Sequence, residues 1–575
     1  MQLVRRLRLP ALFCSLAVLL CELISHPYAE MGIADDRSFI HSAQQLAATG
    51  HILYNGWATP ILGWQLYVAA AFIKLFGFSL TTVRMSTLLV AMALAFLLQR
   101  TLVLVGITER NATLGTLAFV VSPLYLMLSV TFMTDITGLF GIAICLYSCL
   151  RALQAPTTRA TIAWISFAVL SNAICGSSRQ ISWLGILVMV PSTLWLLRSR
   201  RSVLLAGAAA TLAGAVFILA CIVWFKHQPY SIPEHLLPPT FPIVHTVLAF
   251  TYTLLDLPFL LLPIVLIFLP QLRRSRPRTV ALFAIVLCGY MFLALYPSHL
   301  RGGFPLEPTA QDHFGLNQHG AFDFTCLPGD QPVFLNRAVW AIFTFASIGG
   351  LLAVIISLLQ SHNSTPLEQP STGVTWKQLR ILLGPFSLVY ILLLVPRAAT
   401  VEIFERYTLA LLVVALLCLV RFYQERIDPR LPVVMALVIA LMAALGIAVT
   451  HNTFALYRAR IALAAQLNAD GVPTTSVNNG WEYNFGVELQ HAGYINDSRI
   501  VRPANAYVPV PTPPPGPCTM FFFEKTPDIH PLYSVSFEPD TCYGPAPFAP
   551  VHYSRWPYRT PGTLYVVRST PPSSR

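Results

Sequence analysis

The sequence predicts an α-helical protein that crosses a membrane many times and carries a small lobe at its C-terminal end. Three observations predict this fold class. Of the 575 residues, 55% are hydrophobic and only 11% are charged, and the mean hydropathy is +0.63. Apolar runs near the length needed to span a bilayer follow one another along most of the chain. Basic residues recur at every second connection between these runs.

About thirteen runs approach the roughly 20 apolar residues that a spanning helix needs. A chain with this composition is too apolar for a soluble globule and too long for a simple anchor. The predicted spans are Leu9–Ser25, Ser86–Val103, Ala112–Val130, Asp135–Leu150, Thr161–Ala173, Gln180–Leu197, Val203–Phe225, Val244–Leu269, Thr279–Tyr296, Ala338–Leu359, Ile381–Pro396, Tyr407–Val420 and Leu431–Thr450.

The basic residues predict the orientation, because Lys and Arg near helix ends are retained on the cytoplasmic side. Arg5, Arg6 and Arg8 place the N-terminus inside. A signal peptide is the alternative for the first segment, but no clear small-residue cleavage site follows, and we favour a retained helix. The net charge of +12 is mostly a topology signal and not a sign of nucleic-acid binding. The other inside connections hold Arg110, Arg151, Arg159, Arg198, Arg200, Arg201, Arg273, Arg274, Arg276, Arg278, Lys377, Arg380, Arg421, Arg426 and Arg430.

Nearly all of the chain outside the predicted spans then falls on the outer face. We predict a membrane domain over residues 1–450, which includes a first outer loop over 26–82, and an extracytoplasmic domain over 451–575. The working surface is therefore expected to be extracytoplasmic. The outer segments are His26–Thr82, Lys226–Pro242, Pro297–Arg337, Arg397–Arg406 and about 125 residues after Thr450.

The first outer loop is predicted to contain helices that lie at the membrane surface. Between Asp35 and Gly50, apolar residues recur at spacings of four and three and so form one apolar face. The apolar stretch Ile61–Phe76, which ends at Gly77, is a second surface helix or a short re-entrant one. The adjacent acids at the start of the first helix are either functional or simple helix caps.

The tail after Thr450 has a different composition. A proline-rich segment at Val508–Pro517 indicates an extended linker. The runs Thr519–Phe523 and Thr563–Val567 predict strands of a small α/β or mostly β lobe. Cys518 and Cys542 would lie in an oxidising compartment under this topology, and we predict a disulfide between them.

Ionisable residues gather at the predicted outer ends of several spans, close to the acids Asp35 and Asp36. Ionisable groups near the hydrocarbon are expensive and are more often functional than decorative. Helix capping, an interfacial position or a local ion pair is the simpler explanation for each of them taken alone. These residues are Asp135 in the fourth span, Arg179 and Gln180 before the sixth, and Glu405, Arg406 and Tyr407 before the twelfth.

The order of these features resembles the membrane glycosyltransferases of the GT-C fold. The resemblance is to the bacterial branch related to protein O-mannosyltransferases and the lipid A aminoarabinose transferase, in glycosyltransferase families 39 and 83. It covers about the first 490 residues, and no single motif is specific. It rests on Asp35-Asp36-Arg37-Ser38-Phe39, Gly50, Trp57, Pro60, Lys74-Leu75-Phe76-Gly77, Arg84, Asp135, Glu405-Arg406-Tyr407 and Gly480-Trp481-Glu482-Tyr483-Asn484.

The resemblance implies an integral membrane enzyme that moves a sugar from a polyprenyl phosphate to a lipid, glycan or protein acceptor on the outer face, with inversion. A bacterial inner membrane is the implied location. Inversion needs a carboxylate that accepts the acceptor's proton, and Asp35 is the candidate. Cations must stabilise the departing phosphate, for which Arg179 ranks first and Arg406 second.

The remaining candidate residues receive less specific roles. Asp135, as a second catalytic acid, and Asp36 are expected to orient the acceptor, bind sugar hydroxyls or hold a divalent cation. No cofactor is certain, and whether Mg or Mn takes part is left open. His41 lacks a second metal ligand at a diagnostic spacing and is expected to be plainly interfacial. The expected substrate-binding residues are Asp36, Arg179, Gln180, Glu405, Arg406, Tyr407 and Glu482.

Two other classes of protein fit the composition. A transporter or flippase of a lipid-linked or small polar substrate would also be polytopic, but such proteins tend to show paired half-repeats and polar sites near the membrane midplane. The sequence shows no such symmetry. A receptor or assembly protein that binds through the outer tail would leave the pairing of Asp35 with Asp135 unexplained.

Overall fold

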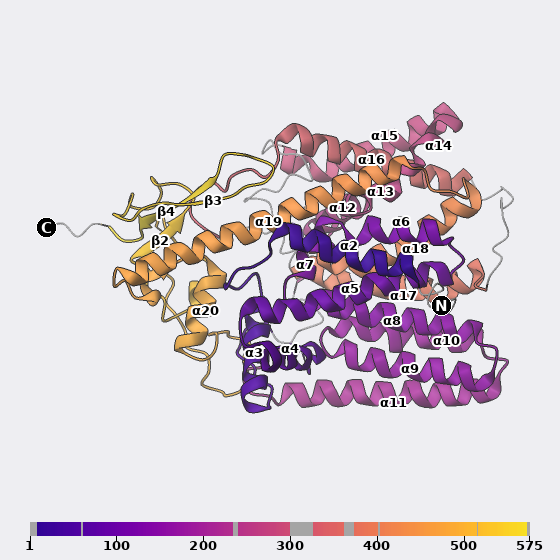
Figure 1. Cartoon of the computed structure of the whole chain (residues 1–575), viewed down its shortest axis with the longest axis horizontal. Coiled ribbons are helices and arrows are strands. Elements are labelled where there is room, and N and C mark those ends of the chain that lie inside the picture. The colour runs from indigo at the N-terminus through magenta and orange to yellow at the C-terminus, as the bar shows by residue number, and fades with distance from the viewer. Residues whose placement is uncertain are drawn as a thin grey trace.

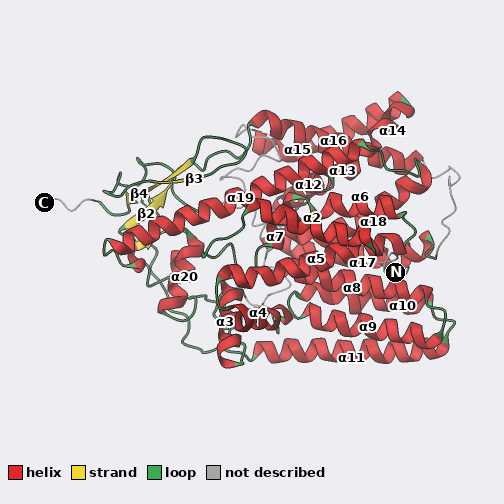
Figure 2. Ribbon diagram, in the orientation of Figure 1, coloured by secondary structure: helices red, strands yellow, loops and turns green. Residues whose placement is uncertain are grey.

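The computed structural model describes residues 8–58, 61–233, 240–299, 326–360, 373–400, 403–513 and 516–571. Most of these residues are helical, and the strands are confined to one small sheet near the C-terminus (Figure 2). The helices form a long bundle, and the N-terminal helix begins at the end of the bundle opposite to the sheet (Figure 1). We call the end of the bundle beside the sheet the lobe end. Arg5, Arg6, Pro60 and most of Pro297–Arg337 lie outside the described residues.

The helices follow the predicted apolar runs closely. The first half contains α2 (Leu9–Ser25), α3 (Asp36–Thr49), α4 (Trp64–Phe76), α5 (Leu80–Leu104), α6 (Glu109–Val120), α7 (Pro123–Ser129), α8 (Thr134–Gln154), α9 (Thr158–Gly176), α10 (Val190–Leu196) and α11 (Arg201–Lys226). The second half contains α12 (Ile243–Leu260), α13 (Leu262–Val265), α14 (Leu269–Arg274), α15 (Pro277–His299), α16 (Arg337–Gln360), α17 (Trp376–Thr400), α18 (Leu409–Arg426), α19 (Val434–Ala469) and α20 (Trp481–His491).

Nine helices among the described residues are long and apolar enough to cross a membrane, or ten if the bent pair α6 and α7 is one span. Shorter apolar helices at Leu9–Ser25, Gln180–Leu196 and Pro277–Phe292 occupy three further predicted spans. Every predicted span therefore coincides with helix, whereas the number of crossings stays a prediction. On α11, Leu205 and Leu212 are 72% and 68% exposed, as expected for a helix that faces lipid.

The predicted span Ala112–Val130 is broken. Helices α6 and α7 meet at an angle of 71°. Pro123 stands at the start of α7, where its missing N–H is tolerated, and the Ser122 hydroxyl accepts a hydrogen bond from the backbone N–H of Tyr125. The start signals of a new helix therefore interrupt a continuous apolar run.

The first outer loop forms the two predicted helices, α3 and α4. Gly50 ends α3 with φ of +79°, and its backbone N–H bonds to the carbonyl of Leu46. This left-handed conformation suits glycine at the end of a helix. Gly77 follows α4 and donates its N–H to the carbonyl of Ile73. Both helices lie at the lobe end of the bundle (Figure 1).

The C-terminal lobe holds a four-stranded sheet of order β1-β2-β4-β3. The strands are β1 (Val477–Asn478), β2 (Tyr533–Ser536), β3 (Val551–Tyr553) and β4 (Gly562–Arg568). Strand β1 pairs with β2 in parallel, whereas β4 pairs antiparallel with both β2 and β3. Helix α19 runs from the bundle into the lobe (Figure 1), and the predicted domain boundary after residue 450 falls inside it.

One predicted strand is confirmed and the other is wrong. Thr563–Val567 lies within β4. Thr519–Phe523 is not a strand, because Phe522 adopts a left-handed conformation with φ of +56° and a 3-10 turn, Phe523–Lys525, follows. The ring of Phe522 packs against Trp481 at a centroid distance of 6.1 Å. Packing onto α20 thus overrides the local preference of an aromatic run for strand.

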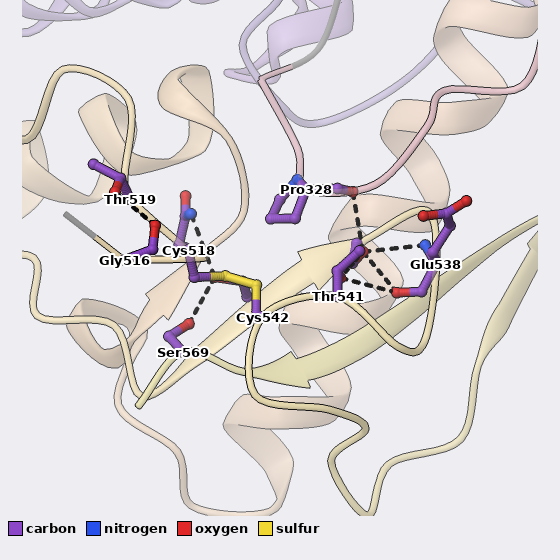
Figure 3. Close-up of a disulfide and its surroundings, with 11 residues drawn as sticks. Pro328, Gly516, Cys518, Thr519, Glu538, Thr541, Cys542 and Ser569 are labelled. Carbon is purple, nitrogen blue, oxygen red and sulfur yellow. Dashed lines mark hydrogen bonds between the residues drawn. A yellow bond between two sulfur atoms is a disulfide. The ribbon is translucent and has the colours of Figure 1, made fainter. Parts of the chain in front are cut away.

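The predicted disulfide between Cys518 and Cys542 is present (Figure 3). The disulfide links the segment before β2 to the loop that follows β2. Near this loop, the hydroxyl of Ser536 donates a hydrogen bond to the carbonyl of Pro328 at 3.0 Å. The connection before α16 therefore contacts the lobe, as expected for a segment on the predicted outer face.

Burial gives the lobe a pH-sensitive acid. Burial and the Asp528 carboxylate raise the pKa of Glu488 from 4.5 to about 7, against the opposing effects of the Asp528 backbone N–H and His491. The folded lobe therefore holds a proton that the unfolded chain releases at lower pH, and this contribution to stability is lost as the pH rises from about 4.5 to 7.

We expect Glu488→Gln to leave lobe stability nearly unchanged at pH 5 and to raise it at pH 8, relative to the wild type. Chemical unfolding of the full chain at both pH values measures the difference. Other titrating groups contribute equally to both proteins. Equal differences at the two pH values would contradict the assignment.

Candidate active site

Five predicted residues meet at the lobe end of the bundle. Asp35 immediately precedes α3, and Asp135 lies in the first turn of α8. Arg179 precedes a short 3-10 helix, Gln180–Trp183, while Arg406 and Tyr407 lie in another, Glu405–Thr408. Four segments that are far apart in sequence thus bring two carboxylates, two guanidinium groups and a phenol together.

Asp35 is held by side chains from other segments and does not cap its helix. It occupies the position before α3, but it makes no capping hydrogen bond. Its Oδ1 accepts a hydrogen bond from Trp57 Nε1 at 2.8 Å. Its Oδ2 lies 3.8 Å from the Nη2 of Arg406, and 29% of the side chain is exposed. Helix capping therefore does not account for this carboxylate. Trp57 holds it in place, and it remains accessible to solvent.

Asp135 forms a buried ion pair with Arg179. Its Oδ1 accepts a hydrogen bond from Arg179 Nη1, whereas its Oδ2 is buried and has no hydrogen-bond partner among the described residues. One turn later, a Cβ at Gly138 would lie 2.9 Å from the Arg179 side chain. Glycine at this position therefore lets the arginine approach α8 closely.

Three arginines surround the ring of Tyr407. The guanidinium carbons of Arg179, Arg397 and Arg406 lie 5.2, 5.5 and 5.6 Å from its centroid. Arg397 also donates a hydrogen bond to the Tyr407 hydroxyl at 3.1 Å. Tyr390 donates to the Tyr407 backbone carbonyl at 2.7 Å and so fixes the ring's position. The aromatic face thereby holds three like charges close together.

Arg406 is the most deeply placed of these cations. Its side chain is 5% exposed, and its Nε and Nη1 have no hydrogen-bond partner among the described residues. A cavity of about 10 Å³ lies between Arg406, Arg179, Asp135 and Tyr390. That volume is close to the minimum for one water molecule. The site is therefore a tight polar cluster, and a larger ligand must displace side chains to enter it.

Asp36 has a different environment from its neighbour. It is fully buried and pairs with the fully buried Arg84 at 2.8 Å between Oδ2 and Nε. The other oxygen, Oδ1, accepts the backbone N–H of Ile33 at 2.8 Å. Arg84 also donates to the carbonyls of Ala29 and Met31 at 2.7 and 2.6 Å. This ion pair clamps the chain that leads into α3, and substrate binding by Asp36 stays a prediction.

The remaining candidate residues lie around this cluster. Gln180 is exposed beside Arg179, and Glu405 is buried beside Arg406. Glu482 is buried and binds α19: its Oε2 lies 3.1 Å from Arg460 Nη2, and its Oε1 accepts a hydrogen bond from the Tyr457 hydroxyl. In this structure Glu482 connects α20 to α19, and its role in binding substrate stays a prediction.

The sequence reasoning gave no role to two residues of the site, Trp57 and Arg397. Trp57 lies between the membrane domain and the lobe, with its ring 5.7 Å from Trp481 and 4.7 Å from Phe485 of α20. The sequence offered one indication of a role for Trp57, because Trp57 is among the residues on which the family resemblance rests. For Arg397 the sequence indicated only a position at the end of an apolar run. Its contact with Tyr407 depends on how α17 and α18 pack.

No three His, Cys, Asp or Glu side chains within the described ranges are grouped so that they could hold a metal ion. Burial and the positive charge of Arg37 lower the pKa of His41. His41 is therefore neutral at neutral pH. Participation of Mg or Mn stays an open expectation of the sequence.

No protein family and no curated protein matches the sequence. Among solved structures, the chain is similar to ArnT from Cupriavidus metallidurans bound to undecaprenyl phosphate, at 16% identity and a TM-score of 0.41, over 83% of this chain and 88% of that one. The chain is also similar to arabinosyltransferase EmbB from Mycobacterium smegmatis, at 14% identity and a TM-score of 0.33, over 84% of this chain and 43% of that one.

The chain is also similar to the S. cerevisiae protein O-mannosyltransferase Pmt1-Pmt2 complex, at 17% identity and a TM-score of 0.30 over 37% of this chain. It spans about a third of the length of that chain, 33%. All three are glycosyltransferases of the GT-C type, the type that the sequence resembles.

We expect Trp57→Phe to reduce turnover about tenfold, because it removes the hydrogen bond that orients Asp35 while the ring packing remains. Trp64→Phe is the matched control, since the buried Trp64 Nε1 bonds to nothing among the described residues. Steady-state kinetics measure the turnover number of each variant relative to the wild type. Equal turnover in the two variants would remove Trp57 from the site.

We expect Asp36→Ala to destabilise the protein by about 3–5 kcal/mol, because it leaves Arg84 buried without its carboxylate. The double substitution Asp36→Leu with Arg84→Met should cost less than Asp36→Ala alone. Unfolding of the detergent-solubilised chain measures both. A single variant as stable as the wild type would show that the clamp is dispensable.

Proposed function

We propose that this protein is an integral membrane glycosyltransferase that moves a sugar from a polyprenyl-phosphate donor to an acceptor on the extracytoplasmic face, with inversion. The observation that carries the proposal is an accessible carboxylate, Asp35, beside three clustered arginines. Arg406 offers two donor nitrogens that have no hydrogen-bond partner among the described residues. An anionic group such as a phosphate would complete the site.

Asp35 is the proposed general base. Inversion requires the acceptor to attack the anomeric carbon on the face opposite to the phosphate, and the acceptor must lose a proton as it attacks. Trp57 orients one oxygen of Asp35 at 2.8 Å. The second oxygen faces the cluster and, as part of a partly exposed side chain, can receive the acceptor's proton.

The arginines are proposed to bind the phosphate that departs. As the bond between sugar and phosphate breaks, a phosphodiester becomes a phosphomonoester and gains negative charge. Arg406 has two donor nitrogens without a hydrogen-bond partner among the described residues, and Arg179 and Arg397 contact the same tyrosine ring. Charge-assisted hydrogen bonds from buried guanidinium groups stabilise such an oxyanion strongly.

Asp135 is proposed to serve the reaction in two ways. It pairs with Arg179 and thereby sets the direction of that guanidinium group. Its second oxygen is buried without a hydrogen-bond partner in the described structure, so it can accept a hydrogen bond from a sugar hydroxyl. Leaving that oxygen unsatisfied is costly, and a bound sugar would remove the cost.

The test is transfer from radiolabelled polyprenyl-phosphate sugars by the purified chain in lipid. We expect Asp35→Asn to lower turnover by a factor of about 10²–10⁴, the usual contribution of a general base. Asp428→Asn is the matched control, because Asp428 is exposed and accepts a local hydrogen bond from the Arg430 backbone N–H.

Sugar release that depends on Asp35 from one donor would establish the transferase and its donor class. Full activity of Asp35→Asn would refute the mechanism. Movement of an intact lipid-linked sugar across the bilayer, without cleavage, would instead favour a flippase.

A further inference from the structure

A second cavity lies away from the candidate active site. It is a groove of about 450 Å³ between α17 and α18, lined mainly by apolar side chains. Pockets of this volume are large enough for a small ligand or part of a lipid. Its lining includes Leu379, Leu383 and Val414, together with Trp376, Lys377 and Arg380.

The groove lies at the end of α17 and α18 opposite to the catalytic cluster. Arg397, near the end of α17, contacts Tyr407 at the start of α18. Trp376, at the start of α17, donates its Nε1–H to Glu425 near the end of α18. The two helices are therefore antiparallel. Arg397 lies 21 positions after Trp376, which corresponds to about 31 Å of helix and is close to the thickness of the hydrocarbon core.

The groove carries positive charge at the end where α17 begins. Lys377 and Arg380 line it, are exposed, and have no ion-pair partner in the described part of the chain. Behind them, the fully buried Arg421 pairs with Glu425 at 2.7 Å and lies 4.9 Å from the ring of Trp376. Lys377 and Arg380 therefore have no counter-charge among the described residues.

Two observations indicate that a ligand completes this groove. Arg421, which lies behind the groove and does not line it, is 0% exposed, yet its Nη1 and Nη2 have no hydrogen-bond partner among the described residues. The buried Oγ of Ser387, which lines the groove, also has none. Gly384 leaves the groove open, since a Cβ there would meet no atom within 4 Å. A buried polar group without a partner requires an explanation, and a ligand bound beside it is one.

We propose that this groove binds an anionic phospholipid from the membrane leaflet opposite to the catalytic site. An acyl chain lies along Leu379, Leu383 and Gly384, and the phosphate is held by Lys377 and Arg380. Basic pockets between membrane helices commonly bind anionic headgroups. The distance along α17 separates this phosphate from the one that the catalytic arginines are proposed to bind, so the groove does not depend on the proposed function.

The test is native mass spectrometry of the full chain taken from mixed micelles with equal amounts of phosphatidylglycerol and phosphatidylcholine. The wild type is expected to retain phosphatidylglycerol preferentially. Lys377→Gln with Arg380→Gln should reduce that preference about tenfold. Arg273→Gln with Arg274→Gln removes the same charge from basic residues of α14 and should leave the preference unchanged.

A second pair of variants tests the apolar part of the site. Gly384→Leu fills the groove and should abolish retention of phosphatidylglycerol. Gly289→Leu is the matched control, because a Cβ at this exposed helical glycine also meets no atom within 4 Å but Gly289 does not line the groove. Both substitutions add the same side chain where a Cβ meets no atom within 4 Å, so we expect both variants to fold.

Three results would overturn the proposal. One is an unchanged lipid preference in Lys377→Gln with Arg380→Gln. Another is equal retention of phosphatidylglycerol by Gly384→Leu and Gly289→Leu. The third is displacement of phosphatidylglycerol from the wild type by an equal amount of undecaprenyl phosphate, which would assign the groove to a polyprenyl phosphate.

Discussion

The buried ion pair between Asp36 and Arg84 is the interaction on which the lobe end of the bundle depends. Arg84 belongs to a long helix of the bundle, and its guanidinium group binds both Asp36 and the carbonyls of Ala29 and Met31. The chain that enters α3 is thereby tied to the bundle. Asp35, the neighbouring residue, is presented to Trp57 and Arg406 as a consequence.

The lobe contributes to the same arrangement through aromatic packing. Trp481 and Phe485 of α20 contact the ring of Trp57, which donates a hydrogen bond to Asp35. Helix α20 is in turn held to α19 by the buried pair of Glu482 and Arg460. The lobe therefore helps to build the site, because the indole that orients the Asp35 carboxylate packs against α20 of the lobe.

The antiparallel packing of α17 and α18 gives the bundle two cationic regions. Each end of this helix pair presents one helix N-terminus, where the partial positive charge of the peptide dipoles favours anions. Arginine side chains add to it at both ends: Arg397 and Arg406 near the lobe, and Arg380 and Arg421 at the opposite end. Guanidinium groups bind phosphate through charge-assisted hydrogen bonds, so both regions are suited to phosphate.

The sequence by itself determined the helices and the gathering of Asp35, Asp135, Arg179 and Arg406 at one end of the bundle. Apolar run length and basic connections are local properties, and they set helix position and chain direction without knowledge of packing. Local signals also account for the ends of α3 and α4 at Gly50 and Gly77 and for strand β4.

Only the tertiary structure decided how the adjacent acids divide their roles. Asp35 and Asp36 look alike in sequence, but one meets an indole 22 positions away and the other an arginine 48 positions away. The same holds for the three arginines around Tyr407 and for Phe522, which turns toward α20 and does not extend into a strand. Such roles arise from contacts between segments that are distant in sequence, and the local pattern of residues does not predict these contacts.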